Sequence, residues 1–232
     1  MSLLSGGLDS STVLAIAKNY GFDVTALSFN YGQRHSIEIL SSMRIAKHFE
    51  VEQKVFNLDL SQIGGSSLTS SIPVEKRTLE EIGDRIPSSY VPARNTIFLS
   101  IASAYAETIG AQTIFIGANA LDYSGYPDCR PEFFTSMEQS INLGTKAGLN
   151  SRMRISVPLQ FLSKAEIITR GTALNVPYDL TYSCYNGGEL ACGECDSCLL
   201  RLKGFVEAGI ADPIKYEKYP EFYSRFIKKS GN

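Results

Sequence analysis

Short apolar stretches alternate with longer amphipathic ones along this chain, and no other feature of the sequence limits the fold as strongly. Strands are expected at residues 24–29, 54–58, 113–117 and 154–159. Helices are expected at residues 10–20, 36–49, 96–109, 131–146, 163–174 and 197–208. Such alternation is typical of a parallel sheet that is covered by helices on both faces. We therefore predict an α/β fold with a doubly wound, mainly parallel sheet.

Two parts of the chain depart from this alternation. At most residues 1–4 precede the first glycine turn, so the first strand is either truncated or unusually short. Residues 60–90 are rich in glycine and serine and then in charged residues, without a clear period. We expect this segment to form a long excursion over the ligand-binding edge of the sheet.

The hexapeptide SGGLDS, residues 5–10, stands between a strand end and a predicted helix. Its adjacent glycines, Gly6 and Gly7, let the backbone approach an anion closely, and the helix N-terminus adds N–H groups and a positive dipole. The Gly-Lys-Ser/Thr ending of the P-loop is not present, so cleavage to ADP in the manner of that motif is not indicated. We predict a phosphate-binding loop; the alternative is a strand-to-helix turn capped by Asp9.

Four of the five cysteines lie close together near the C-terminus. Cys184, Cys192, Cys195 and Cys198 have the spacing C-x7-C-x2-C-x2-C, and nearby glycines allow the backbone to wrap a tetrahedral ion. Four thiolates make a closed zinc site without a free position for catalysis, so we predict one structural Zn²⁺ per chain. The alternatives are a redox pair at Cys192 and Cys195, an iron–sulfur cluster, or buried free thiols.

The charge balance limits the partners of the chain. Twenty-two basic and 24 acidic residues leave a net charge of -2, which gives no general attraction for a polyanion, so we expect no nucleic-acid partner. The sequence contains no run of about 18 apolar residues, and its N-terminus shows no basic segment followed by an apolar one. We expect a cytoplasmic protein without a membrane partner.

The hexapeptide in this setting resembles the signature of the PP-loop ATP pyrophosphatase superfamily. The resemblance implies an adenine nucleotide α-hydrolase-like, Rossmann-type fold and cleavage of ATP between its α and β phosphates, with AMP passed to the substrate. Asp9 would orient the loop or a Mg²⁺ ion, and Lys164 would reach the phosphates unless it is a plain exposed first-turn lysine. The expected ATP-binding residues are Leu4, Ser5, Gly6, Gly7, Leu8, Asp9, Ser10, Ser11 and Lys164.

Three further segments place ligand-type residues beyond strand ends or at helix starts, where open α/β sheets bind ligands. They are NYGQRH at 30–35, YVPARN at 90–95 and DYSGYPDCR at 122–130. Together with SGGLDS and the cysteines, and over residues 3–210, they resemble the 7-cyano-7-deazaguanine synthase family of queuosine biosynthesis. The resemblance implies conversion of 7-carboxy-7-deazaguanine, ATP and ammonia into a nitrile.

A ligand of that kind needs particular side chains. Its purine-like edge requires a carboxylate acceptor, for which Asp122 and Asp128 are the candidates. Its plane requires an aromatic surface, which Tyr123 and Tyr126 could supply. Either aspartate could instead be a turn former beside Gly125 or Pro127.

The 7-carboxylate of that ligand requires a cation. Arg94 and Arg130 are the best candidates because a guanidinium binds a carboxylate through two hydrogen bonds, and Arg34 is a third candidate unless it is a solvated charge. His35 would help to take a proton from ammonium. The substrate-binding candidates are Tyr31, Gln33, Arg34, Tyr90, Arg94, Asn95, Asp122, Tyr123, Tyr126, Asp128 and Arg130. The catalytic candidates are Asp9, His35, Arg94, Arg130 and Lys164.

Two units and a dimer are expected. A PP-loop domain would span residues 1–180, and a zinc-binding lobe with a helical tail would span residues 181–232. The tail, at residues 212–226, holds many aromatic residues among charged ones, a composition that suits a subunit interface and predicts a homodimer. The alternative is that the tail packs on its own domain. The aromatic residues are Tyr216, Tyr219, Phe222, Tyr223 and Phe226.

Two other functions are compatible with the phosphate loop. A PP-loop tRNA sulfurtransferase would also adenylate a base, but it needs an RNA-binding surface and a sulfur-carrying cysteine. The acidic balance and the single unassigned Cys129, which we interpret as an apolar filler, argue against it. A non-catalytic nucleotide sensor would leave the segments at 90–95 and 122–130 without a purpose, and a pyrophosphate-release assay would distinguish it.

Overall fold

The computed structural model describes residues 1–33, 35, 37–83, 85–120 and 126–230. Five parallel strands form one sheet in the order β3-β2-β1-β4-β5. The strand order reverses between β1 and β4, and this switch point is where a doubly wound sheet binds its ligand. The predicted fold class is therefore confirmed. The strands are β1 (Ser2–Leu3), β2 (Ala26–Asn30), β3 (Gln53–Asn57), β4 (Thr113–Phe115) and β5 (Arg154–Ser156).

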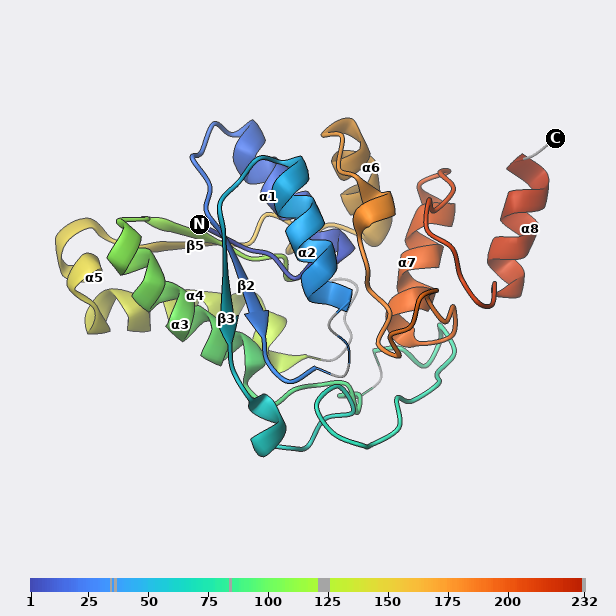
Figure 1. Ribbon diagram of the computed structural model, residues 1–232, viewed down its shortest axis with the longest axis horizontal. Coiled ribbons are helices and arrows are strands. Elements are labelled where there is room, and N and C mark those ends of the chain that lie inside the picture. Colours follow the sequence, from blue (N-terminus) through green and yellow to red (C-terminus); the bar gives the residue numbers. More distant parts are fainter. Residues whose placement is uncertain (34, 36, 84, 121–125, 231–232) are drawn as a thin grey trace.

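Helices cover both faces of the sheet (Figure 1). Apolar residues of α1, α2 and α6 pack in one core cluster, and those of α3 and α4 pack in a second cluster on the opposite face. The helices are α1 (Leu8–Asn19), α2 (Ile37–His48), α3 (Arg94–Ile109), α4 (Pro131–Gly144), α5 (Lys146–Ser151), α6 (Lys164–Ala173), α7 (Asp196–Glu207) and α8 (Glu221–Ser230). Three short 3-10 turns lie at Leu60–Gln62, Pro127–Cys129 and Tyr178–Leu180.

One predicted helix is in fact two helices. The helix expected at residues 131–146 ends at Gly144, and α5 begins at Lys146. Thr145 between them has an extended backbone, with φ -126° and ψ 151°, and its hydroxyl accepts a hydrogen bond from the Gly148 N–H at 3.0 Å. The side chain of Thr145 thus starts a new helix in a new direction, as threonine at an N-cap does.

The first strand is short and fully used. The Leu4 N–H donates to Leu27 O at 2.8 Å, and the Phe115 N–H donates to Met1 O at 2.9 Å, so β1 is hydrogen-bonded to a neighbour on each side. Leu3 belongs to one core cluster and Leu4 to the other, because successive side chains of a strand point to opposite faces. Hydrogen bonds to a parallel strand on each side thus fix these two residues as a central strand.

The C-terminal lobe shares a core with the sheet domain. The cluster that contains α1 and α6 also contains the cysteines, Phe205 of α7 and Tyr223 of α8. Tyr216 and Tyr223 are buried within the chain, and Phe222 and Phe226 pack against the same cluster. Most aromatic residues of the tail therefore pack on their own chain, as the alternative to a subunit interface expected, and a homodimer stays a prediction without their support.

The excursion at residues 60–90 is tied to the C-terminal lobe. It runs below the sheet edge toward α7 (Figure 1). The Arg77 guanidinium forms a buried ion pair with Asp196 at the start of α7, and Lys76 pairs with Glu194 at 2.7 Å. The long loop is therefore anchored beside the cysteine cluster.

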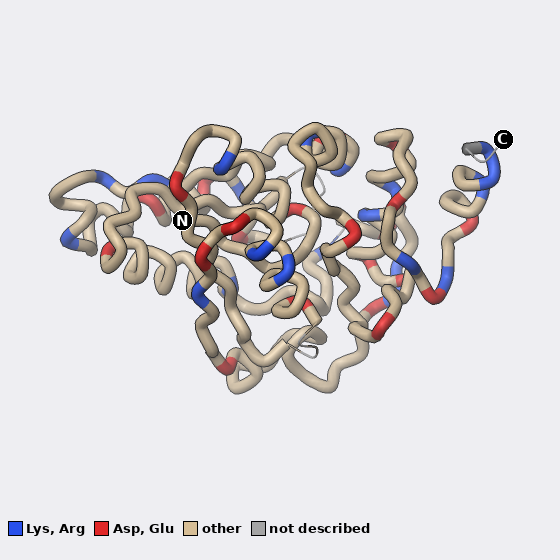
Figure 2. Tube along the Cα trace, turned by 45° about the horizontal axis from the view of Figure 1, so that its top comes forward, with Lys and Arg blue, Asp and Glu red and all other residues tan. Residues whose placement is uncertain are grey.

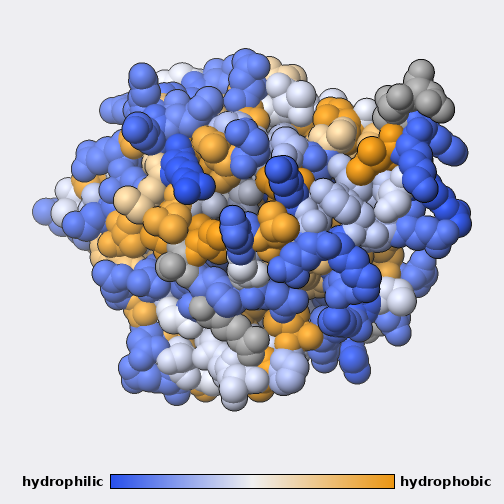
Figure 3. Space-filling model, turned by 45° about the vertical axis from the view of Figure 1, so that its right-hand side comes forward, coloured by the Kyte–Doolittle hydropathy of each residue, from blue (hydrophilic) through white to orange (hydrophobic). Residues whose placement is uncertain are grey.

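Charged and apolar residues are mixed over the surface. Basic and acidic residues are both scattered along the Cα trace (Figure 2), and on the face seen in Figure 3 apolar groups show between hydrophilic ones. The most exposed large apolar residues include Leu143, Leu149 and Phe161. Within the described residues, none of the helices combines the length and the apolar character that a membrane span requires.

A buried ion pair should stabilise the lobe. The Arg201 guanidinium donates to both carboxylate oxygens of Asp212, at 2.7 and 2.9 Å, and the two side chains are 3% and 0% exposed. Asp212→Asn leaves that guanidinium buried without its counter-charge, so we expect a loss of about 3 kcal/mol in the free energy of unfolding. Urea titration measures it.

The matched control is an exposed ion pair. Glu207→Gln removes the partner of Lys203, where both side chains are about half exposed. That change should cost less than about 1 kcal/mol. Equal losses for the two variants would contradict a stabilising role of the buried pair.

Candidate functional site

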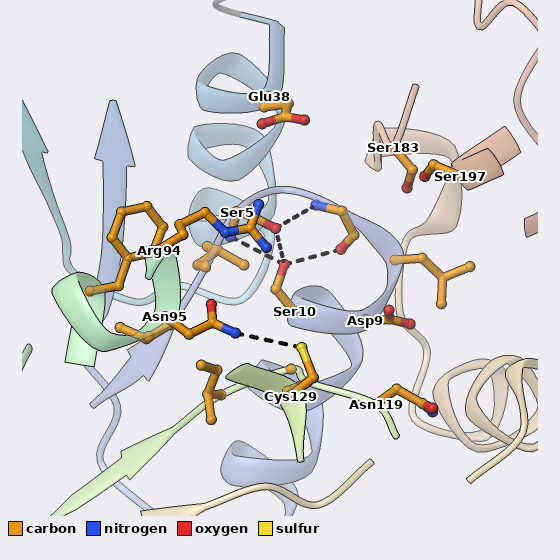
Figure 4. A pocket seen from close by; sticks show the side chains of 18 of the residues that line it. Ser5, Asp9, Ser10, Glu38, Arg94, Asn95, Asn119, Cys129, Ser183 and Ser197 are labelled. Carbon is orange, nitrogen blue, oxygen red and sulfur yellow. Dashed lines mark hydrogen bonds between the residues drawn. The ribbon is translucent and has the colours of Figure 1, made fainter. Parts of the chain in front are cut away.

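A cavity of about 290 Å³ opens where β1 and β4 end, at the switch point of the sheet. The β1–α1 turn forms one wall and the start of α3 another, and the segment before α7 closes the side toward the cysteine lobe (Figure 4). A pocket of this size suits a small molecule. The expected residues that line it are Leu4, Ser5, Gly7, Leu8, Asp9, Ser10, Tyr31, Gln33, Arg94, Asn95, Tyr126 and Lys164.

The glycine turn has the geometry of an anion-binding loop. Gly6 has a φ of +86°, a region that favours glycine, and Gly7 has an extended backbone at the N-cap of α1. The hydroxyls of Ser5 and Ser10 lie 3.0 Å apart, and the Gly7 N–H points to the Ser5 hydroxyl at 3.3 Å. Hydroxyl and N–H donors therefore converge at the positive end of a helix, as phosphate binding requires.

Two glycines permit close backbone contacts around this loop. A Cβ on Gly6 would lie 2.5 Å from the Glu38 carbonyl oxygen of α2. A Cβ on Gly117, just after β4, would lie 2.9 Å from the Ser10 nitrogen. Gly6 and Ser11 do not line the cavity themselves, but Gly6 determines the shape of its floor.

Asp9 and Lys164 form an ion pair at the edge of the loop. The Lys164 ammonium donates to both carboxylate oxygens of Asp9 at 2.9 Å. Asp9 lies in the first turn of α1 and Lys164 in the first turn of α6, so the pair joins two helix starts over the cavity. Lys164 is 13% exposed in this pair and is not a plain surface lysine.

The start of α3 forms another wall of the cavity. Arg94 begins that helix and lies over the ring of Tyr126, with its guanidinium carbon 6.0 Å from the ring centre. The preceding Ala93 has a φ of 54°, an uncommon conformation that turns the chain into the helix. The Asn95 amide donates to Asp128 O at 3.0 Å and to Cys129 Sγ at 3.6 Å. A cation is thus held over an aromatic ring in the cavity that the glycine loop also lines.

Three expected substrate residues lie outside the cavity lining. Asp128 is buried behind α3, where its carboxylate accepts the Asn95 N–H at 3.0 Å and caps that helix. Arg130 is exposed and donates from its Nε to Pro127 O at 3.1 Å. Tyr90 packs against Tyr126 and accepts the Ala93 N–H at 3.1 Å. These three residues support the walls of the cavity from behind.

Three other candidates cannot be placed. Arg34, Asp122 and Tyr123 lie outside the described residues. The assignment of the base-reading carboxylate to Asp122 therefore stays a prediction.

A small side chamber adjoins the cavity where α2 begins. Its lining includes His35 and Glu38, and Glu38 also lines the main cavity. Burial raises the pKa of the Glu38 carboxyl to about 7, although Arg94 partly opposes this shift. Burial likewise raises the pKa of the nearby Tyr31 hydroxyl to about 12.

Several lining residues were not anticipated from the sequence. Glu38 stands inside a predicted helix without a motif, and Phe98 follows the YVPARN segment by one helical turn. Ser183 and Tyr185 flank Cys184. A metal site orients the residues next to its ligands, so this position in the sequence is a weak indication that the two side chains belong to the functional site. The remaining unanticipated residues include Asn119, Ser197 and Arg201.

The four cysteines form one cluster. Their sulfur atoms all lie within 4.8 Å of one another, and those of Cys192 and Cys198 are 3.9 Å apart. A tetrahedral ion with metal–sulfur bonds of about 2.3 Å places its sulfurs about 3.8 Å apart, so the cluster fits a metal. The N–H groups of Cys192, Glu194 and Cys195 point to cluster sulfurs at 3.3–3.4 Å, which favours thiolates.

The fold and the cavity together define the class of protein. A parallel sheet with an anion-binding turn and a cation in one cavity at its switch point is typical of an α/β protein that binds a small molecule with a phosphate group. The family model described as "Queuosine biosynthesis protein QueC" matches residues 1–209. The chain belongs to this family.

Curated relatives match almost the whole chain. A protein from Thermoplasma acidophilum is 63% identical over 227 residues, which are 98% of this chain and 95% of that protein. One from Picrophilus torridus is 59% identical, over 97% of this chain and 95% of that protein. One from Geobacter sulfurreducens is 56% identical, over 92% and 91% respectively. All three are named 7-cyano-7-deazaguanine synthase.

Similarity to solved structures is remote. An NMN synthetase from Francisella tularensis aligns with 99% of this chain and 83% of its own, with a TM-score of 0.48 and 17% sequence identity. A similarity of this level bears on neither the fold nor the function of this chain.

The cysteine cluster should hold one metal ion per chain. Cys195→Ala removes one of four ligands, so we expect loss of the ion and a melting temperature well below that of the unchanged protein. Elemental analysis and thermal unfolding measure the two effects. Cys129→Ala, which removes the one cysteine outside the cluster, is the control and should keep the ion. Loss of the ion without loss of stability would contradict a structural role.

The two loop glycines should respond differently to alanine. The nearest atom to a Cβ on Gly7 would be the Ser5 hydroxyl oxygen at 3.4 Å, so Gly7→Ala should fold normally. Its affinity for ATP should fall about tenfold or more, because the methyl group would stand where a phosphate approaches. Gly6→Ala should instead lose stability, because its Cβ meets α2 backbone. Calorimetric titration with ATP and thermal unfolding compare the two. Normal ATP binding by Gly7→Ala would exclude the loop as the phosphate site.

Proposed function

We propose that this chain is a 7-cyano-7-deazaguanine synthase, an ATP-dependent ligase that converts 7-carboxy-7-deazaguanine and ammonia into the nitrile. The observation that supports this most is identity of 56–63% to relatives of that name over more than nine tenths of the chain. The cavity agrees with the reaction, because it offers an anion-binding loop for ATP and, in the same lining, a cation for a carboxylate.

ATP would bind with its phosphates on the β1–α1 turn. Ser5, Gly7 and Ser10 would donate hydrogen bonds to the departing pyrophosphate. Asp9 would orient the loop or hold Mg²⁺, in which case its partner Lys164 becomes available for a phosphate oxygen. The ion pair between the two side chains keeps both charges at the place where they are needed.

The deazapurine would bind at the α3 end. Arg94 is the candidate for the 7-carboxylate because it lines the cavity, whereas Arg130 lies outside it. Tyr126 and Phe98 offer the aromatic surface for the ring system. The bond between the substrate carboxylate and Arg94 would place a carboxylate oxygen within reach of the α-phosphate on the loop.

The reaction requires two activations. A carboxylate and a nitrile have the same oxidation level, so no redox cofactor is needed, but two oxygen atoms must leave. The first adenylation forms an acyl adenylate, from which ammonia displaces AMP to give the amide. The second adenylation converts the amide oxygen into a leaving group, and loss of AMP gives the nitrile. Each adenylation releases one pyrophosphate, so two are released per nitrile.

The cysteine cluster would hold a structural Zn²⁺, because four thiolates leave no open coordination position. Sulfur transfer is less well supported, because burial raises the pKa of Cys129, the fifth cysteine, to about 12 and keeps it a thiol. Cytoplasmic location and a homodimer are part of this proposal. No nucleic-acid partner is proposed.

The stoichiometry tests this mechanism. We expect two AMP and two pyrophosphate per nitrile from the acid, and one AMP per nitrile from synthetic 7-amide. Arg94→Ala should lower the rate with the acid about 100-fold and the rate with the amide less, because the neutral amide needs a cation less. Chromatography of nucleotides and nitrile measures both.

Arg130→Ala is the matched control, since it removes the same charge outside the cavity. It should leave both rates within about twofold. Formation of ADP, one AMP per nitrile from the acid, or an inert amide would each refute the mechanism.

A further inference from the structure

The side chamber beside α2 has the size of a single small molecule. Its volume is about 20 Å³, enough for one water molecule or one ammonium ion. It adjoins the main cavity, because Tyr31, Gln33 and Glu38 line both spaces. The residues around it are Tyr31, Gln33, His35, Glu38, Leu68, Cys184 and Tyr185.

The polar groups of the chamber favour a hydrogen-bond donor with positive charge. The Gln33 side-chain oxygen already accepts the Tyr31 N–H at 2.7 Å. The Glu38 carboxylate, in contrast, accepts no hydrogen bond from any residue that the structure describes. A carboxylate with free acceptor capacity in so small a space matches a compact cation that donates several hydrogen bonds.

Arg94 would not compete for this carboxylate during the reaction. It is the cation that acts on Glu38 from α3. Under the proposed function, the substrate carboxylate binds to the Arg94 guanidinium and neutralises its charge. Arg94 then no longer balances the negative charge of Glu38. Binding of the acid would thus prepare the chamber for a second, smaller cation.

We propose that Glu38, together with His35, binds ammonium in this chamber and delivers it as ammonia to the adenylated carboxylate. The inference rests on the proposed function and adds the subsite for its third substrate. Because the chamber adjoins the cavity between the glycine loop and Arg94, ammonia would enter beside the carbon that it attacks.

Ammonium gives one proton to the Glu38 carboxylate, and the nitrogen lone pair attacks the carbonyl carbon of the acyl adenylate. A C–N bond forms, the C–O bond to AMP breaks, and AMP leaves with that electron pair. The nitrogen loses a second proton to His35 as the neutral amide forms. Conversion of the amide to the nitrile uses no further ammonia.

Glu38→Gln tests the proposal with three substrates. At constant pH the variant should show an apparent KM for ammonium raised about tenfold or more, because one charge-assisted contact is lost. Hydroxylamine is uncharged at neutral pH and should still trap the acyl adenylate at the normal rate. Synthetic 7-amide should still give nitrile at the normal rate, which also shows that the variant is folded.

Glu132→Gln is the matched control, because Glu132 occupies the first turn of α4 as Glu38 occupies that of α2 but lies outside the chamber. It should change none of the three rates. An unchanged KM for ammonium in Glu38→Gln, or an equal loss with the amide, would overturn the ammonium site and assign Glu38 to the ring or to ATP. Failure of the unchanged protein to form nitrile from acid and ammonium would instead refute the proposed function.

Discussion

The close approach of Gly6 to its neighbours is the contact on which the arrangement of the site depends. Because Gly6 has no side chain, the backbone of α2 lies closer to it than a Cβ atom would allow. The Gly6 carbonyl also accepts a hydrogen bond from the Tyr182 N–H at 2.9 Å. The glycine loop therefore holds both α2 and the segment that leads to Cys184. Gly6 thus belongs to the anion-binding turn and also positions the two elements that complete the cavity.

The cysteine lobe acts on the site through position. The cluster stands at the start of α7, and the ion pairs of Glu194 and Asp196 with residues 76 and 77 draw the long excursion to the same place. Ser183, which precedes Cys184, and Ser197, which lies between Cys195 and Cys198, face the cavity (Figure 4). A metal ion held there would order the wall of the cavity opposite the sheet without contacting the reacting atoms.

The charges of the cavity are separated by the fold. The phosphate loop lies at the start of α1, Arg94 at the start of α3 and Glu38 at the start of α2. Each helix follows a different strand of the sheet, and parallel strands bring all three helix starts to one edge. Under the proposed function, nucleotide, carboxylate and ammonium would meet at one point while their binding groups stay on separate rigid elements.

Local patterns in the sequence determined the sheet, most helix boundaries, the glycine loop and the cysteine cluster, because each depends on residues close together in the chain. Tertiary packing decided which members of the motifs reach the cavity. Asp128 and Arg130 belong to the same segment as Tyr126, yet one caps α3 and the other faces solvent, since the turn at Pro127–Cys129 points successive side chains in different directions. Glu38 has no motif at all, and only the approach of α2 to Gly6 brings its carboxylate to the site, a contact between distant residues that no local pattern encodes.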